Sequence, residues 1–255
     1  MRSGTPVVAD ESRCVASPAV RVQGVHDVDV SIRLPLLAVA ILTLVVGAGP
    51  VAAGGLARVV SHGDRDDHVI ALTFDDGWGI EPCRSIRRTL RREGVAATFF
   101  PNSQFVEYHP GFWRRVARDF PIGNHTVRHP FLTQLSDRRV RYQIARAERS
   151  IEAITGVPMI KVFRPPYGAY DESVRRIAAD LGYDTLLMWD VDPADGSRRS
   201  AAQIRRNALR GRNGSVVLMH CAWPETAAAL PGIIDGYRSR GFDFVTVPQL
   251  LAGID

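Results

Sequence analysis

The sequence predicts a parallel α/β domain that closes, or nearly closes, into a distorted (β/α) barrel of about seven strands. Three observations predict this fold. From His68 onward, short apolar runs alternate with amphipathic stretches of helical length, an order typical of a parallel sheet covered by helices. The helical stretches begin and end at recognisable capping residues. The chain has 255 residues, 45% of them hydrophobic, which is enough to form one large core.

The expected strands are seven apolar runs, and the expected helices lie between them. Pro82 begins the first helix and Gly94 ends it. Ser136 caps a second helix, whose apolar residues recur at steps of three and four, and Gly156 ends it. Asp171 begins a third helix. The runs expected as strands are Val69–Phe74, Ala96–Phe100, Phe120–Ile122, Ile160–Phe163, Tyr183–Trp189, Ser215–Met219 and Asp243–Val247.

The N-terminal quarter has a different composition. Residues 1–33 are polar without apolar periodicity, and we expect this leader to be disordered or absent from the mature protein. Residues 34–53 carry no charge and are typical of the apolar region of a signal peptide. The alternative is an uncleaved membrane anchor. Either assignment places the remainder outside the cytoplasm, as a linker over 54–67 and one domain over 68–255.

The formal net charge of +5 raises the hypothesis of nucleic-acid binding, but the type of basic residue argues against it. Lys161 is the single lysine among 32 Lys and Arg residues. Phosphate binding rarely excludes lysine so completely, because lysine binds phosphate well as a point charge. A coding bias toward arginine explains the excess more simply. We therefore expect no nucleic-acid partner.

Acidic residues and histidines stand where expected strands end, which is where parallel barrels carry functional groups. Asp75 and Asp76 follow the first strand and precede Gly77. They indicate either a cation site or a solvated turn. His125 and His129 are four residues apart, so a helical turn would place both imidazoles on one face, where they can bind one metal ion.

Three further groups follow later strands. Arg164 ends the fourth strand, and the two prolines after it hold the backbone rigid. Asp195 is the last of three acidic residues after the fifth strand, and His220 ends the sixth. A histidine alone at a strand end is more often structural than catalytic. His220 therefore indicates a catalytic site only together with the other groups at the strand ends.

The order of these motifs resembles the polysaccharide deacetylase family, also known as the NodB-homology domains of carbohydrate esterase family four. The resemblance covers Val69 to Val247. Its motifs are the Thr-Phe-Asp-Asp-Gly run, the His-Thr-Val-Arg-His run, the Arg-Pro-Pro-Tyr segment and the Leu-Met-His segment. Several short motifs in the right order are jointly specific. The remaining motif, an Asp-x-x-Asp-Trp segment, aligns with Asp192–Gly196, so Gly196 stands where the family has tryptophan.

The resemblance implies a metal site and a base. Asp76, His125 and His129 would bind one divalent ion, usually zinc and sometimes cobalt or nickel. Asp75 would be the general base and Arg164 would pair with it. Beside a cation and Arg164, Asp75 is expected to stay ionised at low pH.

The resemblance also implies an acid and an acyl pocket. His220 would protonate the departing amine, and Asp195 would orient either His220 or Arg164. The Tyr167 backbone N–H would stabilise the oxyanion, and Leu218 would line the pocket for the acetyl methyl group.

Gly196 leaves the wall of that pocket open. Trp78 or Trp223 would supply a replacement wall, bind a sugar ring, or pack as an ordinary aromatic residue, and for Trp189 we expect a place in the core. Of the three cysteines, Cys83 and Cys221 follow the first and last motifs; they form either a disulfide across the rim of the site or two free thiols.

The resulting functional hypothesis is a secreted or membrane-anchored, cell-wall-associated monomer. It would remove N-acetyl groups from a polysaccharide that contains N-acetylglucosamine, such as peptidoglycan or a chitin-like glycan. Two alternatives remain open: an O-deacetylase acting on a glycan such as acetylxylan, and a carbohydrate-binding domain with the same fold and weak catalysis.

Overall fold

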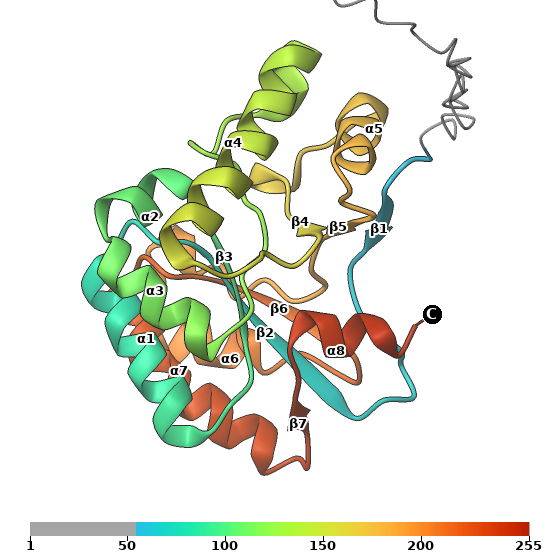
Figure 1. Cartoon of the computed structure of the whole chain (residues 1–255). Coiled ribbons are helices and arrows are strands. Elements are labelled where there is room, and N and C mark those ends of the chain that lie inside the picture. The colour runs from blue at the N-terminus through green and yellow to red at the C-terminus, as the bar shows by residue number, and fades with distance from the viewer. Residues whose placement is uncertain (1–54, 255) are drawn as a thin grey trace, which may run out of the picture. The chain divides into compact units, whose positions relative to one another are not determined.

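The structure is a computed structural model, and it describes residues 55–254 (Figure 1). Its strands are β1 (Arg58–Val60), β2 (Val69–Asp76), β3 (Thr98–Pro101), β4 (Val162–Phe163), β5 (Thr185–Leu187), β6 (Ser215–His220) and β7 (Asp243–Phe244). Its α-helices are α1 (Ile80–Glu93), α2 (Ser103–Tyr108), α3 (Pro110–Asp119), α4 (Asp137–Thr155), α5 (Glu172–Asp180), α6 (Ala201–Ala208), α7 (Pro224–Arg238) and α8 (Val247–Ala252). Three short 3₁₀ helices cover Leu132–Gln134, Pro166–Gly168 and Asp195–Ser197.

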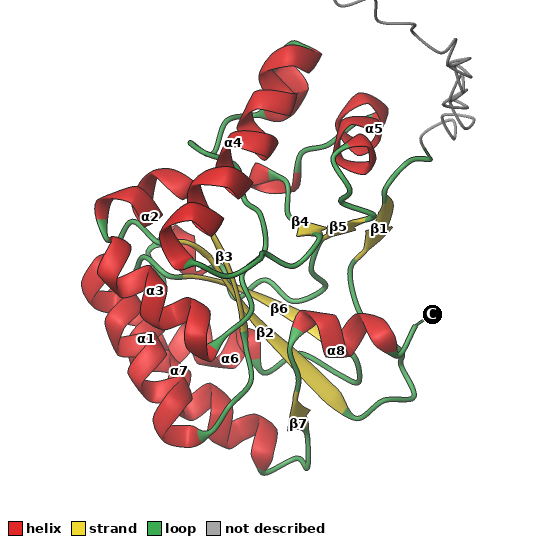
Figure 2. Cartoon of the chain, in the orientation of Figure 1, coloured by secondary structure: helices red, strands yellow, loops and turns green. Residues whose placement is uncertain are grey.

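The strands form two parallel sheets that bridging residues join into a distorted barrel. One sheet has the order β1-β5-β4, and the other has the order β3-β2-β6, with β7 paired to the start of β2. On one side of the barrel, Ile122 pairs with β3 and Asn124 pairs with β4. On the other side, Val191, after β5, pairs with β6. The predicted distorted α/β barrel is therefore confirmed, with helices outside the strands (Figure 2).

Two of the expected segments differ from the structure. The expected strand Phe120–Ile122 is not formed as a strand. Ile122 makes a single bridge to Phe99 of β3, and Asn124, just beyond it, makes a single bridge to Phe163 of β4. The segment 54–67, expected as a linker, contributes β1 within its described part, because Arg58–Val60 pairs with β5. This pairing covers the edge that β5 would otherwise expose.

The predicted helix boundaries match at most positions. Gly94 and Gly156 end α1 and α4 in the left-handed conformation, with φ of 61° and 76°, which glycine adopts at low cost. The Asp171 side chain accepts a hydrogen bond from the Val174 backbone N–H at the start of α5. Helix α1 begins at Ile80, two residues before the expected Pro82. Proline fits there because N–H groups in the first turn have no partner within the helix.

The barrel core is mostly apolar, and β2 is the central strand of its sheet, between β3 and β6. All residues of β2 after Val69 are buried, which explains why it appears in the sequence as a nearly unbroken apolar run. Its last two residues are the exception in polarity, since Asp75 and Asp76 are buried carboxylates. Buried charges are costly without partners, so the end of β2 is where the fold must supply them.

The N-terminal segments predicted from the sequence, 1–33 and 34–53, lie outside the described residues. Among the helices between residues 55 and 254, none combines the length and the hydrophobicity needed to cross a membrane.

Candidate active site

The two carboxylates at the end of β2 lie in one pocket because the backbone turns sharply there. Asp76 has a φ of 73° and Gly77 a φ of 104°. A β-carbon on Gly77 would lie 2.4 Å from the Trp113 ring, so this position requires glycine. A hydrogen bond from the Asn102 backbone N–H to the Asp76 carbonyl stabilises this strained conformation. Strain of this kind is typical of functional sites.

Asp76, His125 and His129 form a compact group of side chains that could hold a metal ion. Their ligand atoms all lie within 4.8 Å of one another. The Oδ1 atom of Asp76 lies 3.8 Å from Nε2 of His125 and 3.7 Å from Nε2 of His129. A carboxylate and two imidazoles that converge in this way fit a divalent transition metal and leave coordination positions open.

The two histidines come together in a different way from the one expected. Residues 125–129 form a loop and not a helical turn, because Thr126 and His129 have positive φ values of 69° and 57°. The Thr126 hydroxyl accepts a hydrogen bond from the His129 backbone N–H. The loop therefore closes on itself and turns both imidazoles toward Asp76.

His125 has the orientation and the neutral form that a metal ligand would need. Its Nδ1–H donates to the Arg164 carbonyl at 2.7 Å, which leaves Nε2 free to bind a metal. The Asn102 side chain donates to the His125 carbonyl at 2.7 Å and fixes the backbone. Burial lowers the pKa of His125 to about 3, so the imidazole is neutral, as coordination requires.

Asp75 is held by a buried arginine. The Arg164 guanidinium is fully buried and donates to Oδ1 of Asp75 at 2.7 Å. It also donates to the Thr73 hydroxyl and to the Leu187 carbonyl, and it lies 4.4 Å from the centre of the Phe100 ring. These contacts fix the position of the guanidinium, and through it the carboxylate.

The expectation that Asp75 stays ionised at low pH assumes a cation beside it and stays a prediction, and the side chains alone act in the opposite direction. Burial raises the pKa of Asp75, and it outweighs the opposite effect of the Arg164 charge. A carboxylate with a raised pKa is a better proton acceptor near neutral pH than one with an ordinary pKa.

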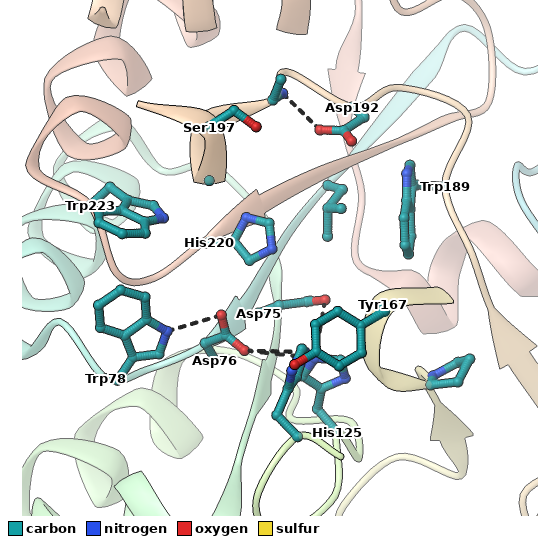
Figure 3. Close-up of a pocket in the computed structure, with 15 residues that line it drawn as sticks. Asp75, Asp76, Trp78, His125, Tyr167, Trp189, Asp192, Ser197, His220 and Trp223 are labelled. Atoms are coloured by element: carbon teal, nitrogen blue, oxygen red, sulfur yellow. Dashed lines mark hydrogen bonds and ion pairs between the residues drawn. The ribbon is translucent and has the colours of Figure 1, made fainter. Parts of the chain in front are cut away.

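His220 lies across the pocket from His125 and pairs with Asp195 (Figure 3). Its Nδ1 donates to Oδ1 of Asp195 at 2.7 Å, and its backbone N–H donates to Oδ2 at 2.8 Å. The Thr226 hydroxyl also donates to Oδ2. Of the two partners that the sequence left open for Asp195, the structure therefore has His220 and not Arg164.

The surroundings of His220 favour its protonated form. Burial alone would lower the pKa of His220, but the hydrogen bond and charge of Asp195, with the charges of Asp75 and Asp76, raise it to about 9. At neutral pH the ring is an imidazolium whose Nδ1 is engaged by Asp195, so Nε2–H is the proton it can donate.

The pocket has a volume of about 380 Å³, within the range of small-molecule sites, and aromatic residues line much of it (Figure 3). Trp78 is exposed, donates its indole N–H to Oδ2 of Asp76 at 3.1 Å, and meets Trp223 edge to face. Trp189, expected in the core, lines the pocket while packing on a core cluster. Leu218 is buried in the pocket wall.

Tyr167 lies beside the metal ligands with its side chain exposed. Its φ of 59° is left-handed, and its ring meets the His129 ring edge to face at 4.3 Å between centroids. The Phe131 ring stacks on Tyr167 at 3.9 Å. Phe131 and Thr226 could not be predicted from the sequence as parts of the site, because neither belongs to a motif.

Gly196 leaves open space in the pocket. A β-carbon at this position would find a single neighbour within 4 Å, Nε1 of Trp223 at 4.0 Å. Trp223 therefore borders the space that a side chain at position 196 would fill.

A disulfide joins Cys83 of α1 to Cys221, the residue after His220. Both cysteines are fully buried, and the Cys221 backbone N–H donates to the Asp75 carbonyl at 2.8 Å. Of the two states left open by the sequence, the structure therefore has the bridged one. The bridge ties the strand end that carries His220 to the helix that follows the Asp75–Asp76 pair.

Comparison with known proteins finds similarity to the polysaccharide deacetylase family. The polysaccharide deacetylase family profile matches residues 62–186. The peptidoglycan-N-acetylglucosamine deacetylase PgdA of Listeria monocytogenes is 34% identical over 183 residues, 71% of this chain and 38% of that protein, so the chain spans about two fifths of its length. The chitooligosaccharide deacetylase of Azorhizobium caulinodans is 30% identical over 211 residues, 76% of this chain and 98% of that protein.

The similarity extends to solved structures. A pseudoenzyme of carbohydrate esterase family four from Bacillus anthracis aligns with a TM-score of 0.73 and 28% identity, over 78% of this chain and 70% of that one. A shared fold therefore does not by itself establish catalysis. Catalysis has to be inferred from the residues in the pocket.

Proposed function

The chain belongs to the polysaccharide deacetylase family, and we propose that it hydrolyses the N-acetyl groups of a polysaccharide containing N-acetylglucosamine. One observation carries the proposal: a cluster of candidate metal ligands shares one pocket with a buried carboxylate held by arginine and an imidazolium held by aspartate. A ligand cluster, a base and an acid in one pocket are what amide hydrolysis requires.

The proposed cofactor is one divalent metal ion held by Asp76, His125 and His129. Zinc prefers such nitrogen and oxygen donors, and cobalt or nickel would also accept them. When bound, the ion polarises the acetyl carbonyl and lowers the pKa of water. The chain's own contribution is to hold the three donors together, with Trp78 engaging the second oxygen of Asp76.

Asp75 is the proposed base. Its Oδ1 is engaged by Arg164, whereas its Oδ2 lies 3.7 Å from Nε2 of His125, on the side of the metal ligands. Oδ2 is therefore the atom that accepts a proton from the attacking water. Arg164 keeps the carboxylate from turning away and stabilises its charge.

His220 is the proposed acid. As water adds to the acetyl carbon, the Tyr167 backbone N–H stabilises the developing oxyanion, and Leu218 contacts the methyl group. His220 then donates its proton to the amide nitrogen as the carbon–nitrogen bond breaks. The products are a free amine on the sugar and acetate, and Asp195 stabilises His220 while it carries the charge.

The proposed location is outside the cytoplasm, at the cell wall. The support is the apolar segment 34–53, which we propose is a signal peptide, with a membrane anchor as the alternative. Cys83 and Cys221 form a disulfide, and disulfides persist in oxidising compartments. We propose that the protein acts as a monomer.

Similarity to a pseudoenzyme and the missing side chain at position 196 favour a second candidate, a glycan-binding domain with weak catalysis. The residues proposed for metal binding and proton transfer are nevertheless all present. Asp76, His125 and His129 lie together, Arg164 pairs with Asp75, and Asp195 pairs with His220, which favours the enzyme.

The test is acetate release from a panel of chitooligosaccharides, peptidoglycan and acetylxylan, with free amines measured in parallel. We expect equal amounts of acetate and amine from the first two substrates, loss of both after removal of metal by a chelator, and recovery with zinc or cobalt. Acetate from acetylxylan alone would indicate an O-deacetylase. Glycan binding without acetate release would indicate the binding domain.

Asp75→Asn is the matched variant for this test. It keeps the size of the side chain and removes the proton acceptor, so we expect activity to fall by about three orders of magnitude or more while the metal content stays equal to wild type. Activity near the wild-type level would show that the base is another group.

A further inference from the structure

A second hollow lies directly beside the active-site pocket. It has a volume of about 430 Å³ and shares Asp76, Trp78 and His129 with the first pocket. These three residues therefore form a ridge with an open space on either side. The other residues that line the second hollow are Asn102, Gln104, Phe105 and Arg128.

Arg128 has a fixed backbone and a free side chain. It stands in the loop between the two histidine ligands, and its backbone N–H donates to Oε1 of Gln143 at 3.2 Å, as does that of Val127 at 3.1 Å. Within residues 55–254, its guanidinium makes no hydrogen bond or ion pair with another residue. The backbone contacts therefore fix the point at which this cationic side chain leaves the loop, and its guanidinium is free to bind an anion in the second hollow.

The charge of Arg128 is not compensated within the second hollow. The one acidic residue that lines it is Asp76, and the two oxygens of Asp76 are engaged by the histidine ligands and by the Trp78 indole. A free guanidinium presents parallel N–H donors that match the two oxygens of a carboxylate.

The wall of the second hollow suits a sugar ring. Trp78 is 43% exposed, and its indole is held in place by the Asp76 hydrogen bond and by the edge of Trp223. Phe105 adds a second aromatic surface. The apolar faces of pyranose rings pack on such surfaces, since aromatic side chains offer broad apolar contact.

We propose that the second hollow binds the sugar adjacent to the one deacetylated, and that Arg128 binds a carboxylate carried by that sugar. This inference rests on the proposed function, because it assumes that the substrate is a glycan reaching the metal site. Two sources supply such a carboxylate. One is the free carboxyl of a lactyl ether on the sugar itself, as in muramic acid. The other is a peptide joined to that lactyl carboxyl through an amide bond, which removes the lactyl charge and brings carboxylates of its own.

The experiment compares the kinetics of wild type, Arg128→Gln and Arg128→Lys on three oligosaccharides of equal length. One is a neutral chitooligosaccharide, one carries free lactyl carboxylates, and one carries the peptide. For Arg128→Gln we expect KM to rise by about 10- to 100-fold on a carboxylate-bearing glycan, with kcat nearly unchanged. Arg128→Lys should recover part of the loss, and all three proteins should act alike on the neutral glycan.

The control is Arg88→Gln, which removes the same charge from the exposed surface of α1, away from both hollows. A loss confined to the lactyl glycan identifies that carboxylate as the group bound, and a loss confined to the peptide-bearing glycan identifies the peptide. Equal KM values for wild type and Arg128→Gln on all three glycans would overturn the inference. Failure of the proposed function would look different, because wild type would then release no acetate from any of them.

Discussion

The carboxylate of Asp195 receives two hydrogen bonds from His220, one from the ring Nδ1 at 2.7 Å and one from the backbone N–H at 2.8 Å. The same carboxylate therefore fixes the backbone at the end of β6 and interacts with the ring that carries the proton. The negative charge of Asp195 contributes to the raised His220 pKa of about 9.

Asp195→Asn is expected to move the alkaline limit of activity to lower pH. His220 must be protonated to act as an acid, so activity falls as pH rises through its pKa. Without the Asp195 charge, burial again dominates and lowers that pKa, with Asp75 and Asp76 the remaining charges that oppose it. The alkaline limb of the kcat profile should therefore shift down by about one pH unit or more.

Asp192→Asn is the matched control for this shift. Asp192 lines the same pocket, but its carboxylate accepts a hydrogen bond from the Ala194 backbone and has none from His220. It should leave the alkaline limb unchanged. If Asp195→Asn left the limb in place as well, Asp195 would not set the protonation of the acid.

Trp78→Phe is expected to weaken metal binding. The indole N–H engages Oδ2 of Asp76, which leaves Oδ1 facing both histidines. Loss of a group that orients a ligand typically costs 10- to 100-fold in metal affinity, and we expect about that loss here. Competition with a chromophoric chelator measures it without reference to catalysis.

Trp223→Phe is the control, because Trp223 contacts Trp78 in the same aromatic pair and lines the same pocket, while the indole that donates to Asp76 is that of Trp78. An equal loss of affinity in both variants would assign the effect to aromatic packing and contradict a role for the indole N–H.

The disulfide between Cys83 and Cys221 is expected to stabilise the fold. It closes a loop of 138 residues, and a bridge across a loop of that size restricts the unfolded chain strongly. Replacing both cysteines by serine should lower the free energy of unfolding by about 2–5 kcal/mol. Urea unfolding of the variant, compared with oxidised and reduced wild type, measures the effect. Equal midpoints for oxidised and reduced wild type would contradict it.

The central strands, and the candidate metal-binding residues that the structure brings together, could be predicted from local sequence. Strand β2 is buried on all sides and is therefore a long apolar run, and the acids at its end stand out against that run. Strand β1 could not be predicted in the same way. It has three residues, one of them buried, and it forms because β5 offers an edge 127 residues later in the chain.

The pairs that side chains form across the site could not be predicted from the sequence for a related reason. Whether Asp195 holds His220 or Arg164 depends on the direction in which a loop returns, and that direction depends on the packing of distant helices. Thr226 belongs to α7 and meets Asp195 only through this packing. The His125–His129 spacing indicated two residues that do lie together, but in a different geometry, since positive φ values replaced the expected helical turn.

Gly196→Trp is expected to narrow the acyl group that the pocket accepts. Position 196 faces open space, with Nε1 of Trp223 at 4.0 Å as the one atom near a β-carbon, and its backbone is not in the left-handed region. Gly196→Ala should therefore fold with unchanged stability and serves as the control.

An indole at this position would fill part of the space beside Trp223 and His220, so a longer acyl chain would lose its room while an acetyl group would keep it. Because one methylene in a pocket changes kcat/KM by about 10-fold or more, the acetyl-to-butyryl preference should rise at least about 10-fold in Gly196→Trp. The ratio of the two kcat/KM values on matched chitooligosaccharides measures it. An unchanged ratio would mean that the space beside Gly196 does not receive the acyl group.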